Sequence, residues 1–267
     1  MTLIFVGLGL EKEDISVKAL NKIKNSDVLY LENYTSKFDD SLEELESFYG
    51  KKIIIANRDL VEKGDEIINL AKQKNVCLLV VGDVFSATTH TDLLLRAKKE
   101  NLEVEVINNV SILNAVSLTG LDLYKFGKTT SIVFPDNNWY PKTPYDAIKN
   151  NLSLGLHTLC LLDIKMAEPS IENLKKGINK PENPRFMTVN QGLNVLLKLE
   201  ELQKEKVLEE TTFCIGVARL GTKNETIKYG KIKDLLLQDF GKELHSIIIP
   251  GTLNEIEKEV LNYHKIY

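Results

Sequence analysis

Short apolar runs alternate with amphipathic segments through the first half of the chain. Five runs rich in valine, isoleucine and leucine are predicted to be strands, at residues 3–6, 28–31, 53–56, 76–81 and 103–107. Apolar residues at helical spacing predict helices at residues 16–25, 60–73, 93–100 and 111–118. Strands that alternate with helices in this way predict a parallel sheet covered by helices.

The second half of the chain has a less regular pattern. It predicts strands at residues 131–134, 157–164, 211–218, 226–229 and 246–249, and helices at 144–151, 188–203 and 253–264. Residues 166–186 are rich in Pro, Asn, Lys and Glu, which predicts a surface excursion. We therefore expect two α/β domains, an N-terminal parallel-sheet domain at residues 1–126 and a C-terminal mixed-sheet domain at 127–267.

Composition excludes several broad classes of protein. The 267 residues are 43% hydrophobic and 27% charged, with a net charge of −4, as expected of an ordinary enzyme and not of a nucleic-acid binder. No apolar run approaches the roughly 20 residues that span a membrane, and no signal peptide is evident. The cysteines Cys77, Cys160 and Cys214 lie far apart in apolar runs. They predict buried thiols in a reducing, cytoplasmic compartment.

A polar segment follows the fourth predicted strand, at residues 82–92. It places Gly82, Asp83 and a cluster of hydroxyl side chains, Ser86 among them, between a buried strand and a helix. Ligands bind at the carboxyl ends of strands in open α/β sheets, although a glycine turn and a helix cap would explain the same residues. Residues 108–113 repeat the pattern after the fifth strand, which predicts a second ligand-facing edge.

Other motifs argue against familiar nucleotide and metal chemistry. Gly7 and Gly9 follow the first strand, but Lys12 replaces the third glycine of a dinucleotide-binding loop, and nearby acidic residues would repel a pyrophosphate. Neither a P-loop nor a G-x-S-x-G nucleophile elbow occurs.

The four histidines lack the spacing of a metal pair, so we expect no metal site. His157 and His264 are predicted to be structural. His90 and His245 lie at element boundaries, where a ligand could be met.

Taken together, several segments resemble the diphthine synthase family of tetrapyrrole-methylase-like (class III) methyltransferases. The resemblance covers essentially the whole chain and is carried by residues 7–10, 14–18, 31–36, 82–92, 111–116, 123–127, 155–165 and 245–251. Val84 departs from the family pattern, which has proline there, and valine leaves the backbone of this turn less constrained.

The resemblance implies two α/β domains with S-adenosylmethionine in the cleft between them, no metal and a homodimer. The product of the cofactor would be S-adenosylhomocysteine. Carried over position by position, the cofactor-binding residues would be Leu10, Asp83, Ser86, Ser111, Ile112, Leu162, Leu220 and His245. No catalytic residue is assigned, because the sequence does not identify the group that accepts the proton of the substrate amine.

The resemblance also implies the protein substrate, elongation factor 2. Its 3-amino-3-carboxypropyl-histidine would receive three methyl groups on nitrogen, giving diphthine, and a fourth on the carboxylate, giving diphthine methyl ester. Residues 166–190 resemble an insertion of the eukaryotic branch, which favours four transfers. Tyr34, Lys165 and Arg185 are candidates to meet the acceptor.

Three alternatives stay open at this point. The chain could stop at trimethylation, or it could be a tetrapyrrole methylase of the same superfamily. It could also be a non-catalytic module that binds S-adenosylmethionine or pairs with elongation factor 2.

Overall fold

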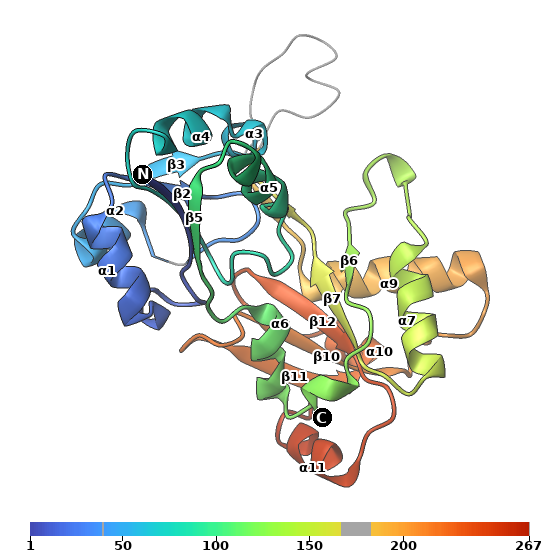
Figure 1. Cartoon of the computed structure of the whole chain (residues 1–267). Helices are drawn as coiled ribbons and strands as arrows, with labels where there is room; N and C mark the ends of the chain where they lie inside the picture. Colours follow the sequence, from blue (N-terminus) through green and yellow to red (C-terminus); the bar gives the residue numbers. More distant parts are fainter. Residues whose placement is uncertain (39, 167–182, 267) are drawn as a thin grey trace. The chain divides into compact units, whose positions relative to one another are not determined.

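The computed structural model describes residues 1–38, 40–166 and 183–266 (Figure 1). Their contacts divide the chain into two compact units, Met1–Asn114 and Ala115–Tyr267, and each unit contains one five-stranded sheet. The α/β class expected from the sequence is confirmed. The domain boundary that the sequence predicts, after residue 126, stays a prediction.

The sheet of the first unit is entirely parallel. Its strand order is β3-β2-β4-β1-β5, and every neighbouring pair runs in the same direction. The carboxyl ends of all five strands therefore meet at one edge, as the alternating sequence pattern predicts. The strands are β1 (Thr2–Gly7), β2 (Val28–Glu32), β3 (Ile54–Ala56), β4 (Val76–Val80) and β5 (Glu103–Ile107).

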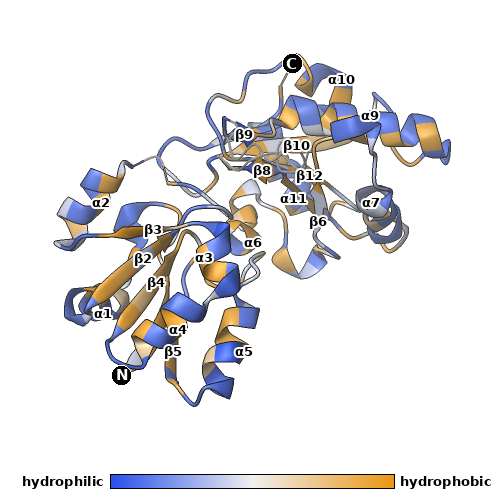
Figure 2. Cartoon of the chain, turned by 90° about the horizontal axis from the view of Figure 1, so that it is seen from above, coloured by the Kyte–Doolittle hydropathy of each residue, from blue (hydrophilic) through white to orange (hydrophobic). Residues whose placement is uncertain are grey.

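Helices cover both faces of this sheet (Figure 1). Ile23 of α1 and Tyr49 of α2 are fully buried in one apolar cluster with Val6 and Leu79, while α4 and α5 lie on the opposite face. Figure 2 shows the strands as hydrophobic along most of their length and the helices as two-sided. The helices are α1 (Val17–Asn25), α2 (Leu42–Tyr49), α3 (Arg58–Lys63), α4 (Asp65–Ala71), α5 (Thr91–Lys99) and α6 (Ile112–Ala115), with a 3-10 turn η1 (Lys12–Asp14).

Two helix predictions are corrected by the structure. The single helix expected at residues 60–73 is two helices, because Gly64 adopts a left-handed φ of 66° and ends α3. A Cβ at this glycine would lie 2.6 Å from Leu93 Cδ1, so the close contact also favours glycine. The helix expected at residues 111–118 is α6 followed by the 3-10 turn η2 (Val116–Thr119).

The sheet of the second unit is mixed, as predicted. Its order is β11-β10-β12-β7-β6, with β6 and β7 parallel and the other pairs antiparallel. Its strands are β6 (Thr130–Ile132), β7 (Thr158–Leu162), β10 (Phe213–Ala218), β11 (Thr226–Lys231) and β12 (His245–Ile249). A separate two-stranded ladder joins β8 (Ile164–Lys165) to β9 (Arg185–Phe186).

The strand predicted at residues 157–164 is interrupted at Asp163. Its N–H donates to Ile132 O at 3.0 Å and its Oδ2 accepts from Phe134 N at 2.9 Å, whereas the next two residues pair with β9 and not with the five-stranded sheet. Of the surface excursion predicted at 166–186, residues 167–182 lie outside the described residues.

One apolar core fills the second unit. It joins Tyr145 of α7 and Leu196 of α9 to Cys160, Cys214 and Ile247 of the strands. The helices are α7 (Thr143–Ser153), α9 (Val189–Gln203), α10 (Ile232–Leu235) and α11 (Glu255–Tyr263), and the 3-10 turns include η3 (Leu123–Lys125) and η4 (Asp136–Asn138). In the part of the chain that the structure describes, no helix is long and apolar enough to cross a membrane.

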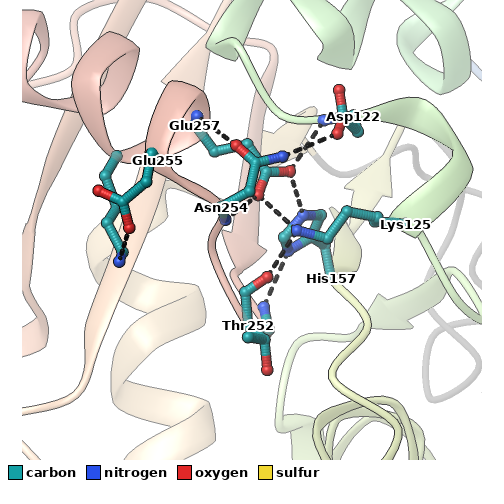
Figure 3. Close-up of polar contacts among 9 residues, drawn as sticks. Asp122, Lys125, His157, Thr252, Asn254, Glu255 and Glu257 are labelled. Atoms are coloured by element: carbon teal, nitrogen blue, oxygen red, sulfur yellow. Dashed lines mark hydrogen bonds and ion pairs between the residues drawn. The ribbon is translucent and has the colours of Figure 1, made fainter.

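A buried polar network anchors α11 to the beginning of β7 (Figure 3). His157 contacts Glu257 Oε1 through Nε2 at 2.9 Å and accepts from Gly251 N through Nδ1 at 2.9 Å. Lys125 donates to the same carboxylate. Burial lowers the pKa of His157, whereas the Lys125, backbone and His157 hydrogen bonds overcome burial and lower the pKa of Glu257 to about 2. The structural role predicted for His157 is confirmed.

Candidate functional site

The loops that follow β1 and β4 are fastened to each other at the carboxyl edge of the first sheet. Gly82 N donates to Gly9 O at 2.7 Å, and Gly9 N donates to Gly82 O at 3.1 Å. Both glycines have a φ near +83°, which few other residues adopt. A Cβ at Gly7 would come within 2.9 Å of Gly82 O. Glycines at these positions therefore allow two backbone loops to approach closely.

Asp83 joins its own loop to the loop that follows β5. Oδ2 accepts from Asn108 Nδ2 at 3.0 Å and from Asn109 N at 3.1 Å. Oδ1 accepts from Phe85 N at 3.1 Å and from Ser86 Oγ at 3.0 Å. Burial would raise the pKa of Asp83, but the four hydrogen bonds together lower it. The Asp83 carboxylate is thus ionised and holds the loops after β4 and β5 together. Four hydrogen bonds from within the protein occupy its two oxygens.

A third connection fixes the loop after β1. Asn109 Nδ2 lies 3.1 Å from both Gly7 O and Asp14 O, and Asp14 Oδ2 accepts the backbone N–H groups of Leu10 and Glu11 at 2.8 and 2.9 Å. Those N–H groups are the donors that a phosphate would need in a dinucleotide loop. The structure therefore explains in atomic terms why this G-x-G segment is unsuited to a pyrophosphate.

The structure brings five of the eight predicted cofactor residues to this edge. Ser111 is 5% exposed and Asp83 is 8% exposed, whereas Leu10, Ser86 and Ile112 are half-buried. Ser111 Oγ accepts from Leu113 N at 3.3 Å as α6 begins. The hydrogen bonds just described hold the loops that carry these five residues close together. That each of the five contacts the cofactor stays a prediction.

Val84, which stands where the family pattern has proline, is fully buried. Its carbonyl accepts from Thr88 Oγ1 at 2.6 Å, which holds the turn from within.

The other three predicted residues meet at one edge of the second sheet. Leu162 ends β7, His245 begins β12, and Leu220 lies just beyond β10. β12 pairs with both other strands in antiparallel register, with Ser246 opposite Leu161 and Ala218 opposite His245. All three predicted side chains are less than a tenth exposed.

His245 is held by backbone on both sides of its ring. Nδ1 accepts from Val189 N at 3.2 Å at the beginning of α9, and Nε2 donates to Lys242 O at 2.8 Å and Gly241 O at 3.2 Å. Burial lowers its pKa despite these carbonyls. The ring is therefore neutral and protonated on Nε2, and its hydrogen bonds make it a positioning group rather than a free base.

Sequence reasoning missed a second buried carboxylate at the first edge. Glu32 ends β2 and is 1% exposed; its oxygens accept from Tyr34 N at 2.5 Å and from Thr35 N and Oγ1 at 2.6 Å. The available signal was a charged residue closing an apolar strand, the same signal that identified Asp83. Tyr34 is 2% exposed, and burial raises its pKa to about 12, which disfavours a direct role in meeting a protein acceptor.

His90 is also buried, at 1% exposure, and its Nε2 lies 3.7 Å from Glu32 Oε2. Neither ring nitrogen has a hydrogen-bond partner among the described residues. The side chain lines a pocket of about 240 Å³ with Val61, Glu62, Thr89, Asp92, Leu93 and Arg96. That His90 meets a ligand stays a prediction.

The described residues contain no group of three or more His, Cys, Asp or Glu side chains placed to hold a metal ion. All three cysteines are buried free thiols, as their apolar surroundings in the sequence predict.

Comparison with known proteins places this architecture in a family. Residues 2–236 match the model of the tetrapyrrole (corrin/porphyrin) methylases. A diphthine methyl ester synthase of Dictyostelium discoideum is 48% identical over 270 residues, covering 100% of this chain and 99% of the relative. A diphthine synthase of Methanocaldococcus jannaschii is 47% identical over 264 residues, covering 98% of each.

A solved structure gives the same result for the fold. A crystal structure of diphthine synthase has a TM-score of 0.85 at 34% sequence identity, covering 99% of this chain and 96% of the other. With parallel and mixed sheets in its two units and full-length similarity to these enzymes, the chain belongs to the tetrapyrrole methylase family of methyltransferases, among the diphthine and diphthine methyl ester synthases.

Proposed function

We propose that this chain uses S-adenosylmethionine to methylate the 3-amino-3-carboxypropyl-histidine of elongation factor 2, in four transfers that end in diphthine methyl ester. The observation that carries the proposal is the 48% identity to the Dictyostelium enzyme along the full length of both chains. The proposal includes a homodimer and a cytoplasmic location, since elongation factor 2 acts there.

The residues at the two strand edges suit an adenosine-type cofactor. Leu162 and Leu220 offer buried apolar surface, and Ser111 adds a polar group beside a backbone loop. Small-molecule sites combine mostly apolar walls with a few fixed polar groups in this way. Asp14 already occupies the N–H groups of the loop after β1, which fits a cofactor without phosphates. We propose that the eight predicted residues bind S-adenosylmethionine.

When bound, S-adenosylmethionine supplies an activated methyl group on a sulfonium and leaves as S-adenosylhomocysteine. The chain therefore has to provide alignment of the acceptor with that methyl group, and orientation effects reach roughly 7–11 kcal/mol in favourable cases. The hydrogen bonds of Asp83, Asn109 and the paired glycines hold the loops rigid before any ligand arrives. The acceptor amine releases its proton to solvent water.

Mass spectrometry of the modified histidine tests this function directly. The purified chain is incubated with S-adenosylmethionine and elongation factor 2 that carries the 3-amino-3-carboxypropyl group; unmodified elongation factor 2 is the control. We expect a ladder of masses that ends four methyl groups above the starting material. Mild alkali should then remove one methyl group, because an ester hydrolyses and a quaternary ammonium does not.

Other outcomes identify the alternatives. A ladder that ends at three, with no alkali-sensitive mass, would assign trimethylation only. Binding of S-adenosylhomocysteine without any transfer would indicate a non-catalytic module. Methylation of uroporphyrinogen or a precorrin, with none on elongation factor 2, would indicate a tetrapyrrole methylase.

A further inference from the structure

Two cationic side chains lie directly opposite each other on the small ladder of the second unit. Lys165 of β8 and Arg185 of β9 are cross-strand partners in antiparallel register. Like charges in this arrangement destabilise a ladder, whereas opposite charges would stabilise it. The pair therefore carries an energetic cost that the ladder itself does not require.

Asp136 offsets part of this cost. Its Oδ1 and Oδ2 accept from Arg185 Nη1 at 3.2 Å and Nη2 at 3.0 Å, and Lys165 donates to Oδ2. The Arg185 and Lys165 hydrogen bonds lower the pKa of Asp136 to about 2, so it stays ionised. In the described part of the chain Asp136 contacts both cations, and these three residues together carry a net charge of +1.

An aromatic ring fixes the two cations from a second direction. The guanidinium carbon of Arg185 lies 4.7 Å from the centroid of the Phe134 ring, and Lys165 Nζ lies 5.9 Å from it. Both distances fall within the range of cation–π attraction. We call Phe134, Asp136, Lys165 and Arg185 the cation cluster. Its charged side chains are 40–43% exposed, so a solute can reach groups whose positions are already set.

The cation cluster lies beyond the carboxyl ends of two parallel strands. β6 and β7 pair with Ile132 opposite Leu162; Phe134 follows the first strand and Lys165 follows the second. Asp163 fastens the two exits together through Phe134 N and Ile132 O. Lys165 is three residues from Leu162, one of the predicted cofactor residues, so the cluster adjoins that edge.

We infer that the cation cluster binds the carboxylate of the 3-amino-3-carboxypropyl group of the acceptor, an inference that rests on the proposed function. A guanidinium and an ammonium held side by side can share a carboxylate through charge-assisted hydrogen bonds. Anchoring the carboxylate leaves the amine of the same group free to receive methyl groups. Esterification removes the negative charge, so the finished product loses this attraction and dissociates more readily.

A similar charge arrangement elsewhere in the unit supplies a matched control. Lys142 and Lys149 both contact Glu205, and Lys142 also pairs with Asp146 at 3.2 Å; the two lysine side chains are 45–49% exposed. Lys149 belongs to α7, Lys142 immediately precedes that helix and Glu205 follows α9, so none of the three is part of the β8–β9 ladder. The double variants Lys165→Gln/Arg185→Gln and Lys142→Gln/Lys149→Gln therefore change net charge equally.

The experiment measures binding of elongation factor 2 in the presence of S-adenosylhomocysteine, so that no turnover occurs. Trimethylated acceptor with a free carboxylate is compared with its methyl ester. We expect the native chain and the control variant Lys142→Gln/Lys149→Gln to bind the carboxylate form at least tenfold more tightly than the methyl ester. Lys165→Gln/Arg185→Gln should bind both forms equally while its affinity for S-adenosylhomocysteine stays within about twofold.

Arg185→Lys, which keeps the charge but loses the planar fork, should retain part of the preference and covers the case in which the double variant does not fold. Equal binding of both forms by the native chain, or an undiminished preference in the variants, would overturn the inference. Failure of the proposed function is seen separately, as absence of methyl transfer by the native chain.

Discussion

Replacing Asp83 with asparagine should loosen the first edge, because the carboxylate accepts hydrogen bonds from four donors. Asparagine keeps one acceptor oxygen and presents an NH₂ group to two of the donors. A hydrogen bond to a charged acceptor contributes about 1.5–3 kcal/mol, and neighbouring losses are not additive. We therefore expect Asp83→Asn to lower the free energy of unfolding of the first unit by about 2–4 kcal/mol.

The same change should weaken cofactor binding. Asp83 orders the loops after β4 and β5, which carry Ser86, Ser111 and Ile112. If these residues contact the cofactor, their disorder should reduce the affinity for S-adenosylhomocysteine by tenfold or more, which corresponds to about 1.4 kcal/mol.

Denaturant unfolding followed by far-UV circular dichroism, together with calorimetry, measures both effects. The single tryptophan, Trp139, lies in the second unit, so its fluorescence follows that unit separately. Asp92→Asn is the control, because it removes the same charge from a side chain that is 66% exposed and pairs with Arg96 on α5. It should change stability by less than about 0.5 kcal/mol. If Asp83→Asn behaves like this control in both assays, our account of the edge is wrong.

Three further predictions concern a turn, acid stability and assembly. Gly9→Ala should destabilise the chain by more than about 1 kcal/mol in denaturant unfolding, because φ is +84° and the new Cβ would lie 2.3 Å from Asp14 Cβ; no loss would contradict the turn geometry. Glu257, with a pKa of about 2 against an ordinary 4.5, adds at most about 3 kcal/mol above pH 4.5, and this is lost as pH falls toward 2. Unfolding across that range should show a shallower pH dependence in Glu257→Gln, and an unchanged slope would refute the assignment. Light scattering should give about twice the 30.2 kDa chain mass, since exposed apolar side chains such as Tyr124 and Leu154 suit a subunit interface; a monomer mass would exclude the dimer.

Local patterns were enough to predict the strands of the first sheet and the polar segment at its edge. A buried parallel strand is a continuous apolar run, and the polar residues that interrupt it mark its end. The break at Gly64 was missed because apolar residues keep helical spacing on both sides of it, while the left-handed φ of Gly64 ends α3 and a side chain at this position would collide with Leu93 of a distant helix.

Side-chain partners far apart in sequence were beyond local reasoning. The donors to Asp83 include Asn108 and Asn109, 25 and 26 residues away, and their approach depends on the order of the strands. The pairing of Glu32 with His90 depends on the same order. The residues around Leu162 and His245 came from family resemblance, because no periodicity in the second half indicates that β7 and β12 are neighbours.

The carboxylate of Asp14 occupies the backbone N–H groups of the loop that follows β1. Abundant cellular nucleotides such as ATP and NAD present phosphates that commonly settle on glycine-rich loops of this kind. Here an internal anion has already taken the Leu10 and Glu11 N–H groups, and it adds a negative charge that repels an incoming phosphate. The occupied N–H groups therefore disfavour binding of any phosphate-bearing nucleotide at this loop.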